Sequence, residues 1–202
     1  MGIKDAKVGF VLKVAEDLFM IRGISDVAIK DIADEAGIGE ATVYRYFKNK
    51  NNIIIQCAMN LGESTFEDYF DLSKAKTGYE KLDIFYNAYL KTFRKKPSNF
   101  YFIKEFDSYM SSHSEAPLEE YENGLIHTFQ DIFMDAYNLG LKDGTVKEIN
   151  DIQTFYFSTT HSLLELCKKL SMKKDILEQD KALKKSSEIK CLVNIILEYI
   201  KK

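Results

Sequence analysis

A run of hydroxyl-bearing, aromatic and cationic side chains near the N-terminus has the chemistry needed to contact nucleic acid. The hydroxyl of Thr42 can hydrogen-bond a base or a phosphate, and its methyl group can contact thymine. Tyr44 and Tyr46 carry hydroxyls on rigid rings that can reach phosphate oxygens. We therefore predict a surface for double-stranded DNA formed by Lys30, Gly39, Glu40, Thr42, Tyr44, Arg45, Tyr46, Lys48 and Lys50.

Two short helices must position these side chains. Apolar residues at helical spacing predict helices over 29–36 and 40–47, joined at Gly37, after a longer helix over 7–22. Helices of two turns are not stable alone, so we expect Val43 to pack with its neighbours against the first helix. This arrangement is a helix-turn-helix, whose second helix fits the major groove of DNA.

The charge of the chain requires that any DNA contact be local. The whole sequence has 28 basic and 31 acidic residues and a net charge of −3. Residues 1–60 contain eight basic and eight acidic residues. The chain as a whole is therefore not a polycation. A local cluster of basic side chains is still compatible with DNA binding.

The segment IKDIADEAGIGEATVYRYFKNK, which starts at Ile29, resembles the DNA-binding domain of TetR-family transcriptional regulators. Matching positions upstream of this segment are Ala15, Leu18, Phe19 and Gly23. The resemblance implies a homodimer that binds a palindromic DNA operator and a C-terminal domain that binds a small-molecule effector.

The same resemblance assigns roles to individual residues. Lys50 falls on the family's phosphate-binding lysine, and Thr42 and Tyr44 fall on its recognition core. The sequence departs from the family pattern at Ala28, where a hydroxyl residue is usual, and at the pair Gly39-Glu40, which follows the turn.

These observations leave two functions open. The first is a ligand-responsive regulator, most simply a repressor that releases its operator when a small hydrophobic or aromatic molecule binds. The alternative is a helical ligand-binding or scaffold protein whose helix-turn-helix has lost specific DNA binding, which the departures at Ala28, Gly39 and Glu40 would favour.

The rest of the chain predicts an all-α protein of about nine helices, with a DNA-binding domain over 1–49 and an effector-binding and dimerisation domain over 50–202. Only 2 prolines and 10 glycines interrupt the sequence, which argues against a turn-rich β-fold. The further helices are expected over 50–72, 79–94, 97–110, 118–139, 152–172 and 186–201.

Aromatic residues are concentrated in the middle of the chain, where 17 of the 26 lie between Phe66 and Tyr137. Such a density suits a cavity for a flat or hydrophobic molecule, although a bulky core would use the same residues. The candidate ligand-binding residues are Phe66, Phe85, Tyr86, Tyr89, Phe93, Tyr101, Phe102, Phe106, Tyr109, Met110, Phe129 and Phe133.

The last two helices have wide apolar faces that can form a four-helix bundle with a second copy. Packing within one protomer is the alternative. The candidate dimer residues are Phe155, Thr159, Leu163, Leu166, Leu170, Leu192, Val193, Ile196 and Ile200.

No group of residues predicts catalysis, a metal site or a cofactor. The three histidines are far apart in the sequence, and His161 is expected to pair with Glu165. We expect Cys57, Cys167 and Cys191 to be reduced, packed thiols of a cytoplasmic protein. No apolar run reaches the ~20 residues that span a bilayer.

Overall fold

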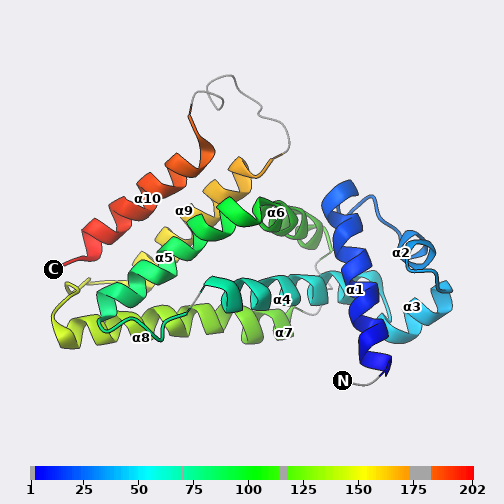
Figure 1. Ribbon diagram of the computed structural model, residues 1–202, viewed down its shortest axis with the longest axis horizontal. Helices are drawn as coiled ribbons and strands as arrows, with labels where there is room; N and C mark the ends of the chain where they lie inside the picture. The colour runs from blue at the N-terminus through cyan, green and yellow to red at the C-terminus, as the bar shows by residue number, and fades with distance from the viewer. Residues whose placement is uncertain (1–2, 70, 114–117, 173–182) are drawn as a thin grey trace.

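The chain forms an all-helical structure, seen here in a computed structural model that describes residues 3–69, 71–113, 118–172 and 183–202 (Figure 1). Within these residues the β-structure is limited to one isolated bridge between Val146 and Lys201. The helices are α1 (Ile3–Arg22), α2 (Ile29–Glu35), α3 (Glu40–Phe47), α4 (Lys50–Tyr69), α5 (Gly78–Lys95), α6 (Pro97–Ser111), α7 (Glu119–Tyr121), the π-helical turn η1 (Glu122–Ile126), α8 (His127–Asp143), α9 (Ile152–Leu170) and α10 (Lys185–Ile200).

The helix count predicted from the sequence is confirmed for the described part of the chain. The segments α7, η1 and α8 follow one another without a break, so they make up the one long helix expected after residue 118. Within it, the π-turn over 122–126 inserts one extra residue into the helical ladder. The other predicted bounds lie within a few residues of the observed ones, apart from the earlier start of α1 at Ile3.

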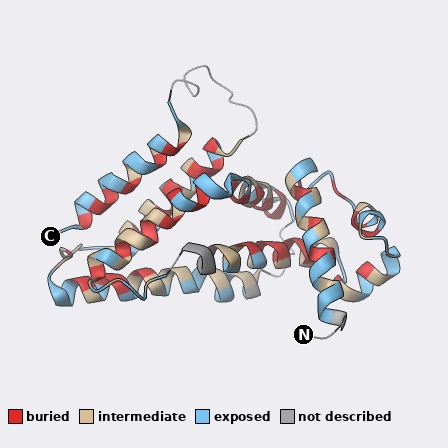
Figure 2. Ribbon diagram, in the orientation of Figure 1, coloured by how far each residue is buried: buried red, intermediate tan, exposed pale blue. Residues whose placement is uncertain are grey.

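Two hydrophobic cores organise the molecule (Figure 2). The first lies between α1, α2, α3, the first half of α4 and the C-terminal half of α6. The second joins α5, α8, α9 and α10. The first core does not stop at the predicted boundary of residue 49, because Ile53, Ile54 and Cys57 of α4 are buried in it.

Local hydrogen bonds fix where several helices begin. Thr77 accepts a hydrogen bond from the backbone N–H of Glu80, whose carboxylate accepts one from Thr77 in return. Asp151 caps α9 in a similar way through Thr154. Helix α2 starts at Ala28 without a side-chain cap, and the carboxylate of Asp31 accepts the Ala28 N–H instead.

Helices α5 and α8 cross at two glycines. A Cβ atom on Gly78 would lie 2.0 Å from the backbone nitrogen of Gly140, which no relaxation of side chains could relieve. The carboxylate of Asp143 accepts a hydrogen bond from the Gly78 N–H at the same crossing. The close approach of the two backbones therefore depends on the absence of a side chain at Gly78.

The cysteines differ in exposure. Cys57 and Cys167 are buried, as predicted, and burial raises the pKa of each thiol, to about 12 for Cys167. The prediction that all three are packed was wrong for Cys191, which is exposed on α10.

Candidate DNA-binding and ligand-binding sites

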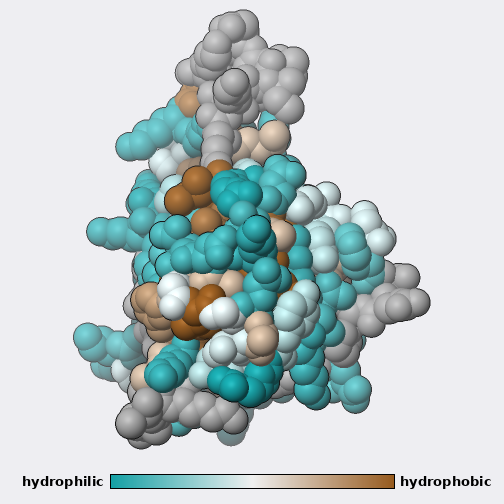
Figure 3. Space-filling view, turned by 90° about the vertical axis from the view of Figure 1, so that its right-hand side faces the viewer, coloured by the Kyte–Doolittle hydropathy of each residue, from teal (hydrophilic) through white to brown (hydrophobic). Residues whose placement is uncertain are grey.

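Helix α3 presents one polar face to solvent and buries the other. Val43 and Phe47 are 0% and 2% exposed, whereas Tyr44 is 49% exposed. Arg45 is also exposed and Thr42 is half-buried. The face of the molecule that carries α2 and α3 is mostly hydrophilic (Figure 3). A helix of eight residues with this exposed face can enter a DNA groove.

Tyr46 is less available than predicted. It is half-buried and packs against the first core, with its ring edge-on to Phe47. The guanidinium of Arg45 lies 5.4 Å from the centre of the Tyr46 ring. Tyr46 therefore supports α3 from the side, and its neighbours Tyr44 and Arg45 are the exposed residues.

Four of the predicted DNA-contacting residues meet in one shallow groove. Lys30 of α2, Glu40 and Tyr44 of α3, and Lys50 of α4 line it together with the loop before α2. Residues from α2, α3 and the start of α4 thus contribute to a single surface. Its charge is mixed, because Asp26 also lines the groove.

Lys48 ends α3 in an uncommon backbone conformation. Its φ is 65° and its ψ is −45°, and the Asn49 N–H donates to the Phe47 carbonyl across it. This is a γ-turn, a conformation that is strained for a residue with a side chain. The turn redirects the chain into α4 and leaves Lys48 exposed beside the recognition helix.

Lys50 is tied to the C-terminal part of the molecule. Its ammonium nitrogen lies 5.0 Å from the centre of the Tyr109 ring on α6. The Tyr109 hydroxyl donates a hydrogen bond to Asn51, the next residue of α4. Burial lowers the pKa of Lys50, against the opposite influence of Asp26 and Asp31.

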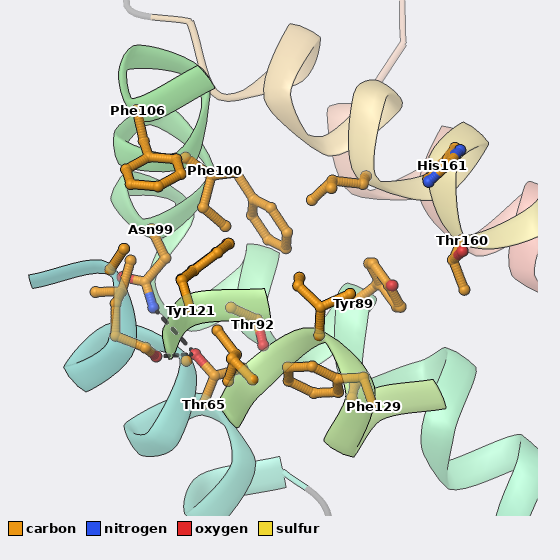
Figure 4. A pocket seen from close by; sticks show the side chains of 18 of the residues that line it. Thr65, Tyr89, Thr92, Asn99, Phe100, Phe106, Tyr121, Phe129, Thr160 and His161 are labelled. Carbon is orange, nitrogen blue, oxygen red and sulfur yellow. Dashed lines mark hydrogen bonds between the residues drawn. The ribbon is translucent and has the colours of Figure 1, made fainter. Parts of the chain in front are cut away.

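An apolar cavity of about 220 Å³ lies between α4, α5, α6, α9 and the π-turn segment (Figure 4). Aromatic rings make up much of its wall, and the exposed residues Ile126, Phe157 and His161 lie at its rim. The lining residues are Ala58, Leu61, Gly62, Thr65, Ala88, Tyr89, Thr92, Asn99, Phe100, Ile103, Phe106, Tyr121, Leu125, Ile126, Phe129, Tyr156, Phe157, Thr160, His161 and Leu164.

Three of the predicted ligand-binding residues line this cavity: Tyr89, Phe106 and Phe129. The side chain of Phe66 lies outside the described residues. The remaining candidates do not line it, and they are Phe85, Tyr86, Phe93, Tyr101, Phe102, Tyr109, Met110 and Phe133.

The predicted aromatic residues that do not line the cavity are packed elsewhere in the fold. Phe85, Tyr86 and Phe133 are packed in the second core, where the Tyr86 hydroxyl pairs with Thr159 of α9. Phe102 lies in the first core, 6.4 Å from the ring of Phe19 on α1. Aromatic content located the region of the cavity, but it did not indicate which side of each helix faces it.

Polar residues in the cavity wall were missed from the sequence. Asn99 donates to the hydroxyl of Thr65 at 3.4 Å, and both side chains line the cavity. The Thr92 hydroxyl is buried without a hydrogen-bond partner. Burial raises the pKa of Tyr89, so its hydroxyl stays protonated. The available signal was the presence of Thr92 and Asn99 within otherwise apolar helical faces.

Helix α6 connects the cavity with the DNA-binding domain. Its N-terminal half supplies Asn99, Phe100 and Ile103 to the cavity wall. Its C-terminal half supplies Tyr109, which contacts Lys50 and Asn51 as described above. A displacement of α6 by a bound molecule would therefore reach the start of α4.

The predicted dimer residues divide into two groups. Leu163, Leu170, Val193, Ile196 and Ile200 are buried within the protomer, in the second core, so they are corrected to core residues. Phe155, Thr159, Leu166 and Leu192 are only partly buried. Packing within one protomer therefore explains the most regular apolar stripe of α10, because α10 contacts α5 and α9.

Other apolar side chains occupy the outer faces of these helices. Ile195 and Tyr199 of α10 are 60% and 53% exposed, whereas the exposed Phe157 of α9 lies at the rim of the cavity. Among the described residues, His161 forms no ion pair with Glu165, whose carboxylate accepts a hydrogen bond from Lys168. Over the described ranges, no helix is both long enough and apolar enough to cross a bilayer.

Comparison with known proteins agrees with this architecture. The family described as bacterial regulatory proteins, tetR family, matches residues 11–57, from α1 into α4. The chain is a TetR-family transcriptional regulator. TetR-family regulators are DNA-binding proteins and not enzymes, which agrees with the prediction from the sequence.

Similar proteins are found for the C-terminal part of this TetR-family regulator as well. The HTH-type transcriptional repressor KstR2 of Rhodococcus jostii is 23% identical over 155 residues, which cover 71% of this chain and 69% of the repressor.

Solved structures share its fold. A putative transcriptional regulator from Saccharomonospora viridis, in complex with choline, superposes with a TM-score of 0.75 at 18% identity and covers 98% of this chain and 99% of its own. The ketosteroid transcriptional regulator KstR2 of Mycobacterium tuberculosis has a TM-score of 0.67 at 18% identity. The superposition covers 96% of this chain and 94% of that regulator.

Proposed function

We propose that this regulator is a homodimeric repressor that releases a palindromic operator when a small, mostly apolar molecule occupies the cavity. The observation that carries the proposal is the continuity of α6, which lines the cavity at one end and contacts Lys50 and Asn51 at the other. A repressor is favoured because the similar protein from Rhodococcus jostii is named as one.

The DNA contact is proposed to come from the exposed face of α3 and the groove beside it. Thr42, Tyr44 and Arg45 would face base edges and phosphates, and Lys30, Lys48 and Lys50 would contact the flanking backbone. In a two-fold symmetric dimer, the two α3 helices would enter successive major grooves about 34 Å apart.

The dimer is proposed to form through the outer faces of α9 and α10. The exposed side chains Ile195 and Tyr199 lie one helical turn apart, and the partly buried Leu192 and Leu166 lie on the same two helices. Exposed apolar side chains that cluster in this way mark protein interfaces. The variant Ile195→Asp is expected to sediment as a monomer. Leu141→Asp, a matched exposed leucine on α8, is expected to leave the dimer intact.

Operator release would follow from the position of α6. A molecule held between α5, α6 and α9 would contact the α6 side chains of the cavity wall, and α6 also packs on α1 and α4. Couplings of this kind are ordinarily worth about 1–3 kcal/mol, or roughly 5–150-fold in affinity.

The proposal is tested by selecting binding sites from random duplexes with the full-length protein and measuring affinity over a range of salt concentrations. An enriched palindrome, with a linear fall of log affinity against log salt, supports the repressor. The absence of any enriched site would favour the alternative of a ligand-binding or scaffold protein. That alternative has one structural observation in its favour, which is the missing side-chain cap at Ala28.

A further inference from the structure

The chemistry of the cavity wall limits what the effector can be. Among the described residues that line the cavity there is no Lys, Arg, Asp or Glu. The one histidine among these described lining residues, His161, lies at the exposed rim. A fully charged group brought inside would lose its hydration without gaining an opposite charge, which is unfavourable.

Two hydroxyls in the wall lack protein partners. The Thr92 oxygen is buried and forms no hydrogen bond. The Tyr89 hydroxyl has no hydrogen-bond partner in the described part of the chain. Tyr89 also lines the cavity and lies one helical turn before Thr92 on α5 (Figure 4). Buried hydroxyls are ordinarily satisfied, so the buried Thr92 hydroxyl marks a place where a polar atom is expected. The half-buried Tyr89 adds a second hydroxyl-bearing side chain to the same wall.

Both hydroxyls can donate a hydrogen bond. Tyr89 stays protonated in this environment, and a threonine hydroxyl carries one proton that rotates freely. A carbonyl oxygen has two lone pairs and can accept from both donors at once. A quaternary ammonium group has no lone pair, so it would leave both hydroxyls unsatisfied.

The size of the cavity sets the size of the molecule. A dry cavity of about 150 Å³ in another protein holds benzene, so a cavity of about 220 Å³ has room for about ten non-hydrogen atoms. Phe100, Phe106 and Phe129 surround this space with ring faces and edges, which suit a flat or aliphatic body.

We infer that the cavity binds a neutral, largely apolar molecule whose single oxygen acceptor, a carbonyl or a hydroxyl, hydrogen-bonds Thr92 and Tyr89. This inference rests on the proposed function only in treating the cavity as the effector site. It adds the charge of the effector, its polar group and the residues that anchor that group.

Calorimetry with four probes tests the inference. Propiophenone has the expected size and a carbonyl, and butylbenzene has the same size without an oxygen. 3-Phenylpropanoate is an anion, and phenyltrimethylammonium is a cation of similar size without an oxygen. We expect propiophenone to bind about tenfold more tightly than butylbenzene, since two hydrogen bonds are added. No binding is expected for the anion or the cation.

Variants locate the polar contact. Thr92→Val and Tyr89→Phe remove one hydroxyl each, and each is expected to weaken propiophenone binding about fivefold while leaving butylbenzene unchanged. Thr92→Ser keeps the hydroxyl and serves as the matched control, with affinity close to that of the wild type. Tighter binding of phenyltrimethylammonium or 3-phenylpropanoate, or equal propiophenone affinity in all variants, would overturn the inference.

Operator binding in the same samples separates this inference from the proposed function. If propiophenone binds through Thr92 and Tyr89 without weakening operator binding, the cavity chemistry stands and the proposed operator release fails. If a charged probe releases the operator and propiophenone does not bind, the proposed function stands and this inference fails.

Discussion

The ammonium nitrogen of Lys50 lies 5.0 Å from the centre of the Tyr109 ring, so the first residue of α4 contacts the C-terminal half of α6. A cation over an aromatic face is attracted by the negative charge density of the ring. This contact places the expected phosphate-binding lysine directly on the helix that lines the ligand cavity. The Tyr109 hydroxyl, which bonds Asn51, fixes the ring in this position.

Lys50→Ala is expected to weaken operator binding and to reduce its salt dependence. Loss of one phosphate contact lowers the slope of log affinity against log salt by about 0.9. Fluorescence anisotropy with a labelled operator over a salt series measures both quantities. Lys142→Ala removes an exposed cation at the end of α8 and should leave the slope unchanged. An unaltered slope in Lys50→Ala would remove Lys50 from the DNA site.

Tyr44→Phe is expected to weaken operator binding by about 1 kcal/mol, because one hydrogen bond from the exposed hydroxyl is lost. Tyr44→Ala should weaken it further, since the ring contact is lost as well. Sedimentation of both variants should match the wild type, because α3, which carries Tyr44, lies far from α9 and α10 (Figure 1). Full affinity in both variants would contradict the assignment of α3 as the recognition helix.

Gly78→Ala is expected to destabilise the protein by about 1–3 kcal/mol or more, because its new Cβ would collide with the backbone of Gly140. In a protein of this size the melting temperature should fall by about 2–4 °C per kcal/mol. Gly9→Ala is the control, since a Cβ there meets nothing within 4 Å and alanine favours the helix. A Gly78→Ala protein as stable as the wild type would show that α5 and α8 are further apart than described.

Thr92→Val should raise the stability of the ligand-free protein by about 1–3 kcal/mol, because it replaces a buried hydroxyl that has no partner. Urea denaturation without ligand measures the change as a higher midpoint at unchanged slope. Thr160→Val is the comparison, since the Thr160 hydroxyl already donates to the Tyr156 carbonyl. Destabilisation of Thr92→Val would indicate that its hydroxyl is satisfied in solution.

Asp31 should make the DNA-binding domain sensitive to acid. The Ala28 N–H and then Arg22 lower the pKa of Asp31 below its ordinary value of 3.8, since both favour the carboxylate. A lowered pKa in the folded state adds stability above 3.8 that is lost as the pH falls through the folded value. Asp31→Asn should therefore be less stable than the wild type at pH 5–7, and the difference should shrink below pH 3.8. A constant difference over this range would contradict the linkage.

The sequence predicted most of the helices because their apolar spacing and end signals are local. Gly37 and Gly144 both have positive φ values next to helix ends, where glycine is favoured. The buried face of α3 was predicted for the same reason, since Val43 and Phe47 are four residues apart. Local patterns of this kind depend little on the rest of the fold.

The partner of each buried face could not be predicted in the same way. The stripe of Ile189, Val193, Ile196 and Ile200 on α10 is buried as its spacing indicates, but it packs within the protomer. On α5, Phe85 faces the core whereas Tyr89, four residues later, reaches the cavity. Which helix covers which face depends on how all the helices pack together. The presence of an aromatic residue in the sequence does not indicate it.

The π-turn over 122–126 is a place where a change of one residue in the sequence would reshape the cavity. One surplus residue is held inside a continuous helix, and this turn places Leu125 and Ile126 in the cavity wall. Removing that residue would restore regular α-geometry and rotate the preceding segment by about 100° relative to α8. Tyr121 would then leave the cavity while α8 kept its place against α5. A single-codon deletion at this turn would thus alter which molecules fit the cavity in one step.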